Sequence, residues 1–86
     1  MFSGKTEGVV FEIDNRYFEY FIDWFGNKYR IIDIDDKKSV IETKTNINAA
    51  YYWSLQYGEI AKVLEPKELK EKIKNGLIEI LHKYEE

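Results

Sequence analysis

Residues 57–66 have the sequence YGEIAKVLEP and lead into a charged amphipathic segment that runs to the last residue. Gly58 is typical of a helix stop, because glycine readily adopts the left-handed backbone that ends many helices. The apolar residues at 60–64 predict a short strand. Pro66 suits the first turn of a helix, where its missing amide hydrogen is not needed. A helix stop, a short strand and a helix begun by proline indicate a small accessory module.

The final helix is predicted from apolar residues that recur at helical spacing and form one stripe. Leaving such a stripe in water is unfavourable, so we expect this helix to be part of the folded unit. The stripe consists of Leu69, Ile73, Leu77, Ile80, Leu81 and Tyr84.

The residues before this stretch alternate between strand and helix patterns. Asp14 and Asn15 offer side-chain oxygens that can cap a first helix, Gly26 is placed to end it, and Asn48 can cap a second helix. In chain order we predict a strand at 8–13, a helix at 16–25, a hairpin of strands at 28–34 and 39–47, a helix at 49–57, a strand at 60–64 and a helix from 66 onward.

This order predicts an α+β fold of the ferredoxin-like, split β-α-β type (βαββαβ) with an appended C-terminal helix. Residues 8–86 are expected to form one domain, and residues 1–7 a lead-in from an upstream domain. Two helices would cover one face of the sheet. The other face is predicted to be half apolar and to be covered by the final helix or by a second subunit. It would carry Val10, Glu12, Tyr29, Ile31, Val40 and Glu42.

Composition narrows the function classes. The chain has 86 residues, a net charge of −3 and no cysteine. Interspersed charges with a negative sum argue against a dedicated nucleic-acid binder, and the lack of cysteine removes zinc-thiolate sites and thiol nucleophiles. No apolar run approaches the roughly 18 residues of a membrane span, so we expect a cytoplasmic protein with no membrane partner.

No group of residues points to catalysis, a metal or a cofactor, so we expect no enzyme. His82 lacks partners for a catalytic role, and the Asp33, Asp35 and Asp36 cluster lacks the glycine and terminal glutamate of a calcium loop. Two functions known for this architecture are also disfavoured, because the chain lacks the residues that they need. Segment 39–45 has no ring for base stacking as in an RNA-recognition motif, and Arg16 does not stand in the glycine-rich loop of an acylphosphatase.

Aromatic residues are the remaining candidates for recognition, since rings outside the core bury a large area against a partner at low entropic cost. Aromatic residues make up 16% of the chain. Core packing and partner contact both remain open for each ring. The interaction candidates are Trp24, Tyr51, Tyr52 and Trp53.

Several short motifs carry a resemblance to a known family. Segment 22–26 (IDWFG) is close to Ile-Asp-Arg-Phe-Gly, and segment 53–58 (WSLQYG) is close to Trp-Leu-x-x-Phe-Gly. Segment 61–69 (AKVLEPKEL), Tyr84 and the opening segment 1–4 (MFSG) also match. Together they resemble the C-terminal extension (WCX) domain that follows the WYL domain in bacterial transcriptional regulators with an N-terminal winged helix-turn-helix.

The resemblance implies a non-catalytic module that packs against the WYL domain of the same or a partner protomer. Such a module helps the regulator form a homodimer and transmits effector binding to a DNA-binding domain that this sequence lacks. The chain is then expected to be part of a longer regulator. Two residues depart from the pattern: Trp24 replaces a usual arginine, and Glu65 replaces a usual serine or proline.

A rival hypothesis is a small-molecule-sensing regulatory domain of ferredoxin-like fold, with its ligand at a subunit interface. Such sites usually have glycine-bearing loops after the first strand, where this chain has Asp14 and Asn15.

Overall fold

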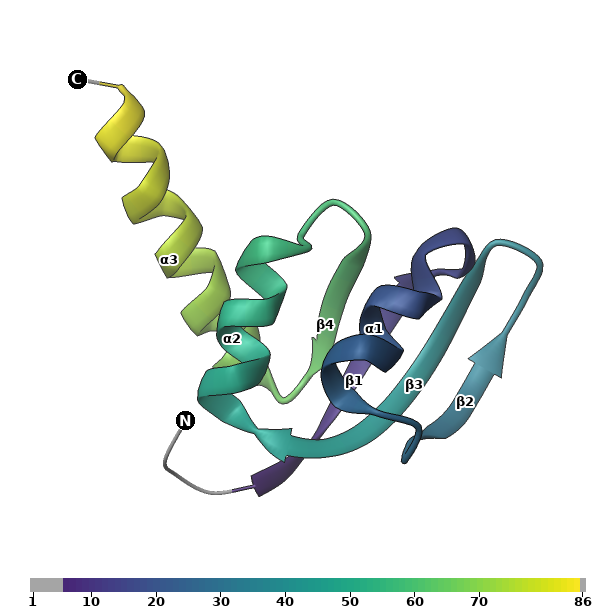
Figure 1. Cartoon of the computed structure of the whole chain (residues 1–86). Helices are drawn as coiled ribbons and strands as arrows, with labels where there is room; N and C mark the ends of the chain where they lie inside the picture. The colour runs from purple at the N-terminus through teal and green to yellow at the C-terminus, as the bar shows by residue number, and fades with distance from the viewer. Residues whose placement is uncertain (1–5, 86) are drawn as a thin grey trace.

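A four-stranded antiparallel sheet forms one layer of the molecule, which the computed structural model describes over residues 6–85 (Figure 1). Its strands are β1 (Thr6–Asp14), β2 (Arg30–Ile34), β3 (Lys38–Asn46) and β4 (Ala61–Glu65), in the order β2-β3-β1-β4. The helices are α1 (Phe18–Phe25), preceded by the 3-10 turn η1 (Asn15–Tyr17), α2 (Ile47–Gln56) and α3 (Lys67–Tyr84). This arrangement confirms the predicted ferredoxin-like α+β fold with a C-terminal helix.

Most element boundaries differ from prediction by one or two residues, and two of these differences change the role of a residue. β1 begins at Thr6, which pairs with Asn46, so residues 6 and 7 belong to the sheet and not to a lead-in; residues 1–5 lie outside the described residues. The second helix begins at Ile47 and its cap is Asn46, not Asn48. The Asn46 side-chain oxygen accepts hydrogen bonds from the backbone N–H groups of Asn48 and Ala49, at 2.8 and 3.1 Å.

The caps predicted at Asp14 and Gly26 are present, whereas α2 ends at Gln56 with Tyr57 as its C-cap, and Gly58 does not have the left-handed φ expected of a helix stop. Asp14 Oδ1 accepts a hydrogen bond from the Arg16 backbone N–H at 2.9 Å, and the Arg16 guanidinium lowers the pKa of this carboxyl through a side-chain hydrogen bond. At the end of α1, Gly26 has φ 82° and donates its backbone N–H to Ile22 O at 2.8 Å. Only glycine adopts this φ at little cost, which is why the helix stops there.

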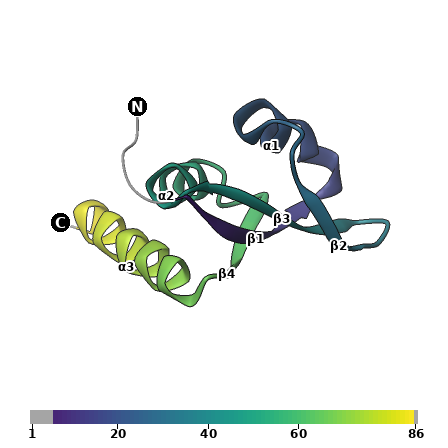
Figure 2. The same cartoon turned by 90° about the horizontal axis from the view of Figure 1, so that it is seen from below.

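The core lies between the sheet and the layer formed by α1 and α2, which cover the same face (Figure 2). Alternate side chains of the central strands point into it, and aromatic rings from both helices meet Phe11 at its centre. Phe11 lies 5.8, 5.3 and 5.4 Å from the ring centres of Phe21, Phe25 and Trp53. The fully enclosed set is Val9, Phe11, Ile13, Phe21, Ile41, Ala50, Trp53, Val63 and Leu69.

The opposite face of the sheet is more polar than predicted. Val10, Glu12, Val40 and Glu42 pair across the strands there as expected. Its charges are joined by ion pairs from Arg30 to Glu42 and from Lys38 to Glu12, at 2.6 and 3.4 Å. Ion pairs of this kind suit a surface in contact with water, so this face does not require a covering subunit.

Two residues predicted for that open face lie on the other one. Ile31 pairs with the buried Ile41, and the Tyr29 ring packs against Phe18 and Phe21 on the helix side. The prediction was wrong because both sets of alternate positions in segment 28–34 carry apolar residues, so the pattern does not show which set faces the core. A register shift between Ile31 and Asp33 also breaks the alternation within β2.

The final helix does not cross the open face either. α3 leaves the β4 edge and lies beside α2, and its C-terminal half projects beyond the rest of the fold (Figures 1 and 2). Tyr51 of α2 packs on α3 at Gly76, where a Cβ atom would collide with the tyrosine hydroxyl. This contact explains a glycine in the middle of a helix, a position where it is otherwise unfavourable.

We predict energetic coupling between Gly76 and Tyr51. In the wild-type chain, the roughly 1 kcal/mol that alanine gains over glycine in a helix is offset by displacement of the tyrosine ring. In a Tyr51→Ala background the gain from Gly76→Ala should appear in full. A double-mutant cycle by urea unfolding is expected to give a coupling energy of about 1 kcal/mol. Additive effects would contradict the packing of α3 on α2 described above.

The β2–β3 turn generates a prediction about pH. The Asp35 carboxylate accepts hydrogen bonds from the backbone N–H groups of Lys38 and Lys37, both at 2.7 Å, and these lower its pKa from 3.8. Because the folded pKa is lowered, the carboxylate stabilises the fold above its unfolded pKa, and this contribution is lost as the pH falls through the folded pKa.

Asp35→Ala should therefore reduce the free energy of unfolding near neutral pH, and the difference from wild type should shrink on acidification. Denaturant unfolding at a series of pH values measures both. Asp36→Ala is the matched control, because Asp36 lies in the same turn and makes no hydrogen bond with the other described residues. Equal pH dependence of the two variants would contradict the prediction.

Candidate interaction site

The first half of α3 is anchored to the domain. Leu69 is enclosed in the core and Ile73 packs against it. Lys72 donates a hydrogen bond to Asn48 Oδ1 at 2.9 Å, and its ammonium group lies 4.5 Å from the centre of the Tyr51 ring. These contacts fix the direction in which the rest of the helix projects.

Residues 6–85 do not provide such cover for the second half of α3. α3 has 18 residues and α2 has 10, so α3 is about 27 Å long and α2 about 15 Å. The longer helix therefore continues past the end of its neighbour. We call the exposed residues of this half the α3 apolar surface: Leu77, Ile78, Ile80, Leu81 and Tyr84, with side chains between 38% and 84% exposed.

This exposure differs from the expectation for the helix stripe. The sequence predicted burial along the whole stripe, and the structure buries Leu69 and partly buries Ile73, but leaves Leu77 and Ile80 in water. Helical spacing shows that a face is apolar, but it does not show how long the neighbouring surface is.

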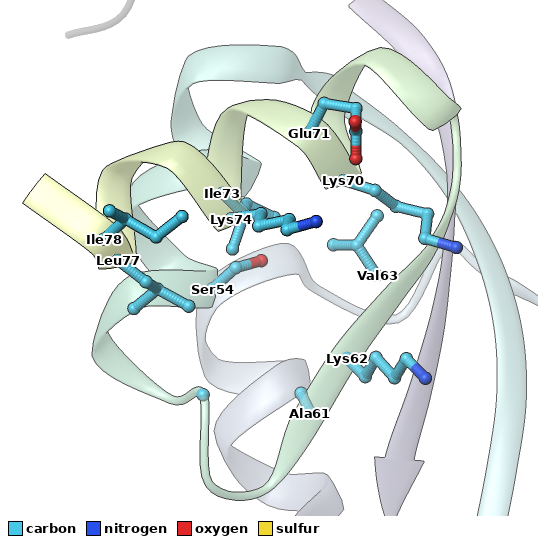
Figure 3. Close-up of a pocket in the computed structure, with 11 residues that line it drawn as sticks. Ser54, Ala61, Lys62, Val63, Lys70, Glu71, Ile73, Lys74, Leu77 and Ile78 are labelled. Carbon is cyan, nitrogen blue, oxygen red and sulfur yellow. The ribbon is translucent and has the colours of Figure 1, made fainter.

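A groove of about 540 Å³ lies between α2, β4 and α3 (Figure 3). Its apolar lining comes mainly from Val63, Ile73, Leu77 and Ile78. The charged residues around it are Lys62 on β4, and Lys70, Glu71 and Lys74 on α3. The Ser54 side chain extends from α2 toward this space, and its buried hydroxyl has no hydrogen-bond partner within residues 6–85. The groove therefore combines an apolar surface with a local excess of positive charge.

The four predicted interaction rings are placed very differently. Trp24 and Tyr52 are exposed, at 46% and 54%. Tyr51 is half buried because it packs between Gly76 and Lys72.

Trp53 has no exposed surface. Its indole lies among Phe11, Phe21 and Phe25, where it joins α2 to the central strand and to α1. Trp53 is thus a core residue, and it is not available to a partner.

A second group of exposed rings was not singled out from the sequence. Tyr20 stacks on Tyr17 and on Tyr57, with ring centres 6.1 and 5.4 Å apart and planes 20° apart in both pairs. The spacing of Tyr17 and Tyr20 places them on one helix face, but no local pattern could show that the half-buried Tyr57, which follows α2, completes the row.

Strand β2 presents a third apolar surface, at the edge of the sheet. Ile31, Ile32 and Ile34 are each about half exposed, because α1 covers this end of the sheet only in part. The register shift within β2 interrupts the regular edge, as is common in strands that avoid pairing with other chains.

The residues considered for catalysis or metal binding are not brought together. His82 is exposed on α3, and Asp33 lies within β2. Asp35 and Asp36 lie in the β2–β3 turn, where Asp35 accepts hydrogen bonds from backbone N–H groups. Over residues 6–85, no three side chains of the metal-binding types come close enough to share an ion.

Comparison with known proteins does not assign a family, since no family model matches the chain and no curated protein matches it. None of the helices described here combines the length and the apolar character needed to cross a membrane.

Substitution of the two tryptophans should reduce stability by very different amounts. Trp53→Ala removes a fully enclosed ring and should cost about 3–5 kcal/mol of folding free energy, whereas Trp24→Ala should cost less than about 1 kcal/mol. Fluorescence provides an independent measurement. Trp24→Phe, which leaves only Trp53, should retain a blue-shifted emission, and Trp53→Phe should shift the emission to the red. The reverse pattern would contradict the placement of the two rings.

Proposed function

We propose that this chain is a non-catalytic interaction module, the C-terminal extension of a WYL-type transcriptional regulator, which promotes dimerisation and couples effector binding to the rest of the protein. The α3 apolar surface is the observation that carries the proposal. Five large apolar side chains on one half-helix form an exposed patch of the kind that marks protein contact sites in soluble domains.

The first half of α3 supports a docking role for the second half. Because Leu69, Ile73 and Lys72 hold the helix to the domain, the projecting half is held in place before a partner binds. A preorganised surface loses less entropy on binding than a disordered tail. The partners we propose are a second copy of the chain and the WYL domain of the same or a partner protomer.

A small-molecule-sensing regulatory domain is the second candidate. The groove beside α3 favours it, because an apolar trough with a few polar groups is the usual form of a ligand site. Leu77 and Ile78 belong both to the groove and to the α3 apolar surface, so a ligand there would lie beside a subunit interface.

We predict reversible self-association through α3. Sedimentation or light scattering over a concentration series should show a dimer, and Leu81→Glu should weaken it by at least about tenfold, because a charge would enter an apolar contact. Glu79→Lys is the matched control. It reverses a charge near Leu81, but helical geometry places it on the opposite side of α3. A chain that stays monomeric at every concentration, or a Glu79→Lys effect equal to that of Leu81→Glu, would contradict self-association through this surface.

The assignment to a WYL-type regulator has a separate test. The genomic sequence directly upstream of the codon for Met1 should encode, in frame, a winged helix and a WYL domain. A stop codon immediately upstream, with no such domains in the same reading frame, would contradict the assignment.

A further inference from the structure

We propose that the groove between α2, β4 and α3 binds a small amphiphilic carboxylate of the fatty-acid class. Its carboxylate would be held by Lys70 and Lys74, and its hydrocarbon chain would lie on Val63 and Leu77. This inference goes beyond an interaction module, because it assigns a ligand site to the chain itself.

The dimensions and lining of the groove fit one hydrocarbon chain. Its volume of about 540 Å³ lies within the range of roughly 300–1,000 Å³ that is typical of small-molecule sites. Most of the lining surface is apolar and comes from β4 and α3, with Ser54 of α2 beside it, so a bound chain would lie in an open trough. Burial of its methylene groups would supply most of the binding free energy.

The charged residues around the groove favour a ligand with a negative charge. Three lysines and one glutamate give this region an excess of positive charge, in a chain whose net charge is −3. Within residues 6–85, none of these lysines forms an ion pair or hydrogen bond with a carboxylate. Lys62 stands opposite Glu12 on the open face of the sheet, and Figure 3 shows its side chain extending from β4 away from Val63, so it is not part of the head-group contact. An anionic head group beside α3 would meet Lys70 and Lys74, neither of which is paired with a carboxylate among residues 6–85.

Ser54 is a second, independent indication of a polar ligand group. Ser54 is only 6% exposed, and its hydroxyl has no hydrogen-bond partner within the described part of the chain. A buried hydroxyl without a partner is unfavourable, and such groups in native proteins usually have one. A carboxylate that enters between α2 and β4 can accept this hydrogen bond once nearby side chains shift.

A peptide fits the groove less well than a fatty acid. An extended peptide would bring a backbone N–H and C=O group at each residue, and a largely aliphatic lining leaves them without partners. A fatty acid has one polar end and therefore needs polar contacts at only one position. A second copy of this chain is the competing occupant, and the experiment below separates the two.

The test is titration of the chain with laurate below its aggregation concentration, by calorimetry and by NMR of backbone amides. Laurate binding should be saturable and should weaken with added salt. It should also shift the NMR resonances of the backbone amides in β4 and α3. Dodecylamine, which has the same chain length and the opposite charge, should bind at least about tenfold more weakly. Equal binding of the two amphiphiles would overturn the proposal.

Variants locate the site. Lys70→Glu and Lys74→Glu should each weaken laurate binding by about three- to tenfold, and the double variant by more. Lys83→Glu is the matched control, because it reverses a lysine of the same helix that does not line the groove. If Lys83→Glu weakens binding as much as the groove variants do, the effect reflects net charge and the proposal fails.

Ser54→Ala distinguishes a ligand contact from a structural role. Because the hydroxyl lacks a partner among residues 6–85, its removal should leave the melting temperature unchanged or raise it, while laurate affinity falls. A lowered melting temperature with unchanged affinity would overturn the role of Ser54.

The Leu81→Glu variant separates this proposal from self-association, since Leu81 does not line the groove. This variant should bind laurate as the wild type does. If laurate binding is lost together with dimerisation, the ligand depends on a composite interface and the single-chain site proposed here is wrong.

Discussion

The contact of Phe11 with Phe21, Phe25 and Trp53 is the interaction on which the rest of the structure depends. Phe11 lies on the central strand β1, and the other three rings come from the two helices that cover the sheet. Edge-to-face and tilted ring contacts favour defined orientations, so the cluster sets the position of each helix on the sheet. Because Trp53 holds α2, it also sets the surface on which α3 packs.

The position of α2 then determines what the protein can offer to a partner. α3 follows the side of α2 through Tyr51 and Asn48, but it is almost twice as long. Its first half belongs to the domain, whereas its second half projects from it with an exposed apolar surface. In the proposed regulator, this division would let one helix serve both as part of the fold and as a docking element.

The charged residues are paired differently on the open face of the sheet and beside α3, and the net charge of the chain does not show this difference. On the open face of the sheet, Arg30 and Lys38 are neutralised by Glu42 and Glu12, and pairs of this kind keep a surface hydrated without drawing a charged partner. Beside α3, Lys70 and Lys74 have no such carboxylate partner among residues 6–85. An acidic chain can therefore present a local site for an anion, because electrostatic attraction depends on nearby charges and is screened over about 10 Å.

The sequence by itself determined the order of the elements, their approximate ends and the fold class. Those features follow from local chemistry: Gly26 ends a helix, the polar cluster at 35–38 turns a hairpin, and apolar spacing separates strands from helices. The sequence did not distinguish Trp53 from Trp24, since both stand on helices among other rings. The predictions from sequence were also wrong about the face of the sheet on which Ile31 lies and about how much of α3 is buried. Tertiary structure decided these points, because each depends on a surface supplied by residues distant along the chain: the ring cluster around Phe11, the register of β2 against β3, and the length of α2 beside α3.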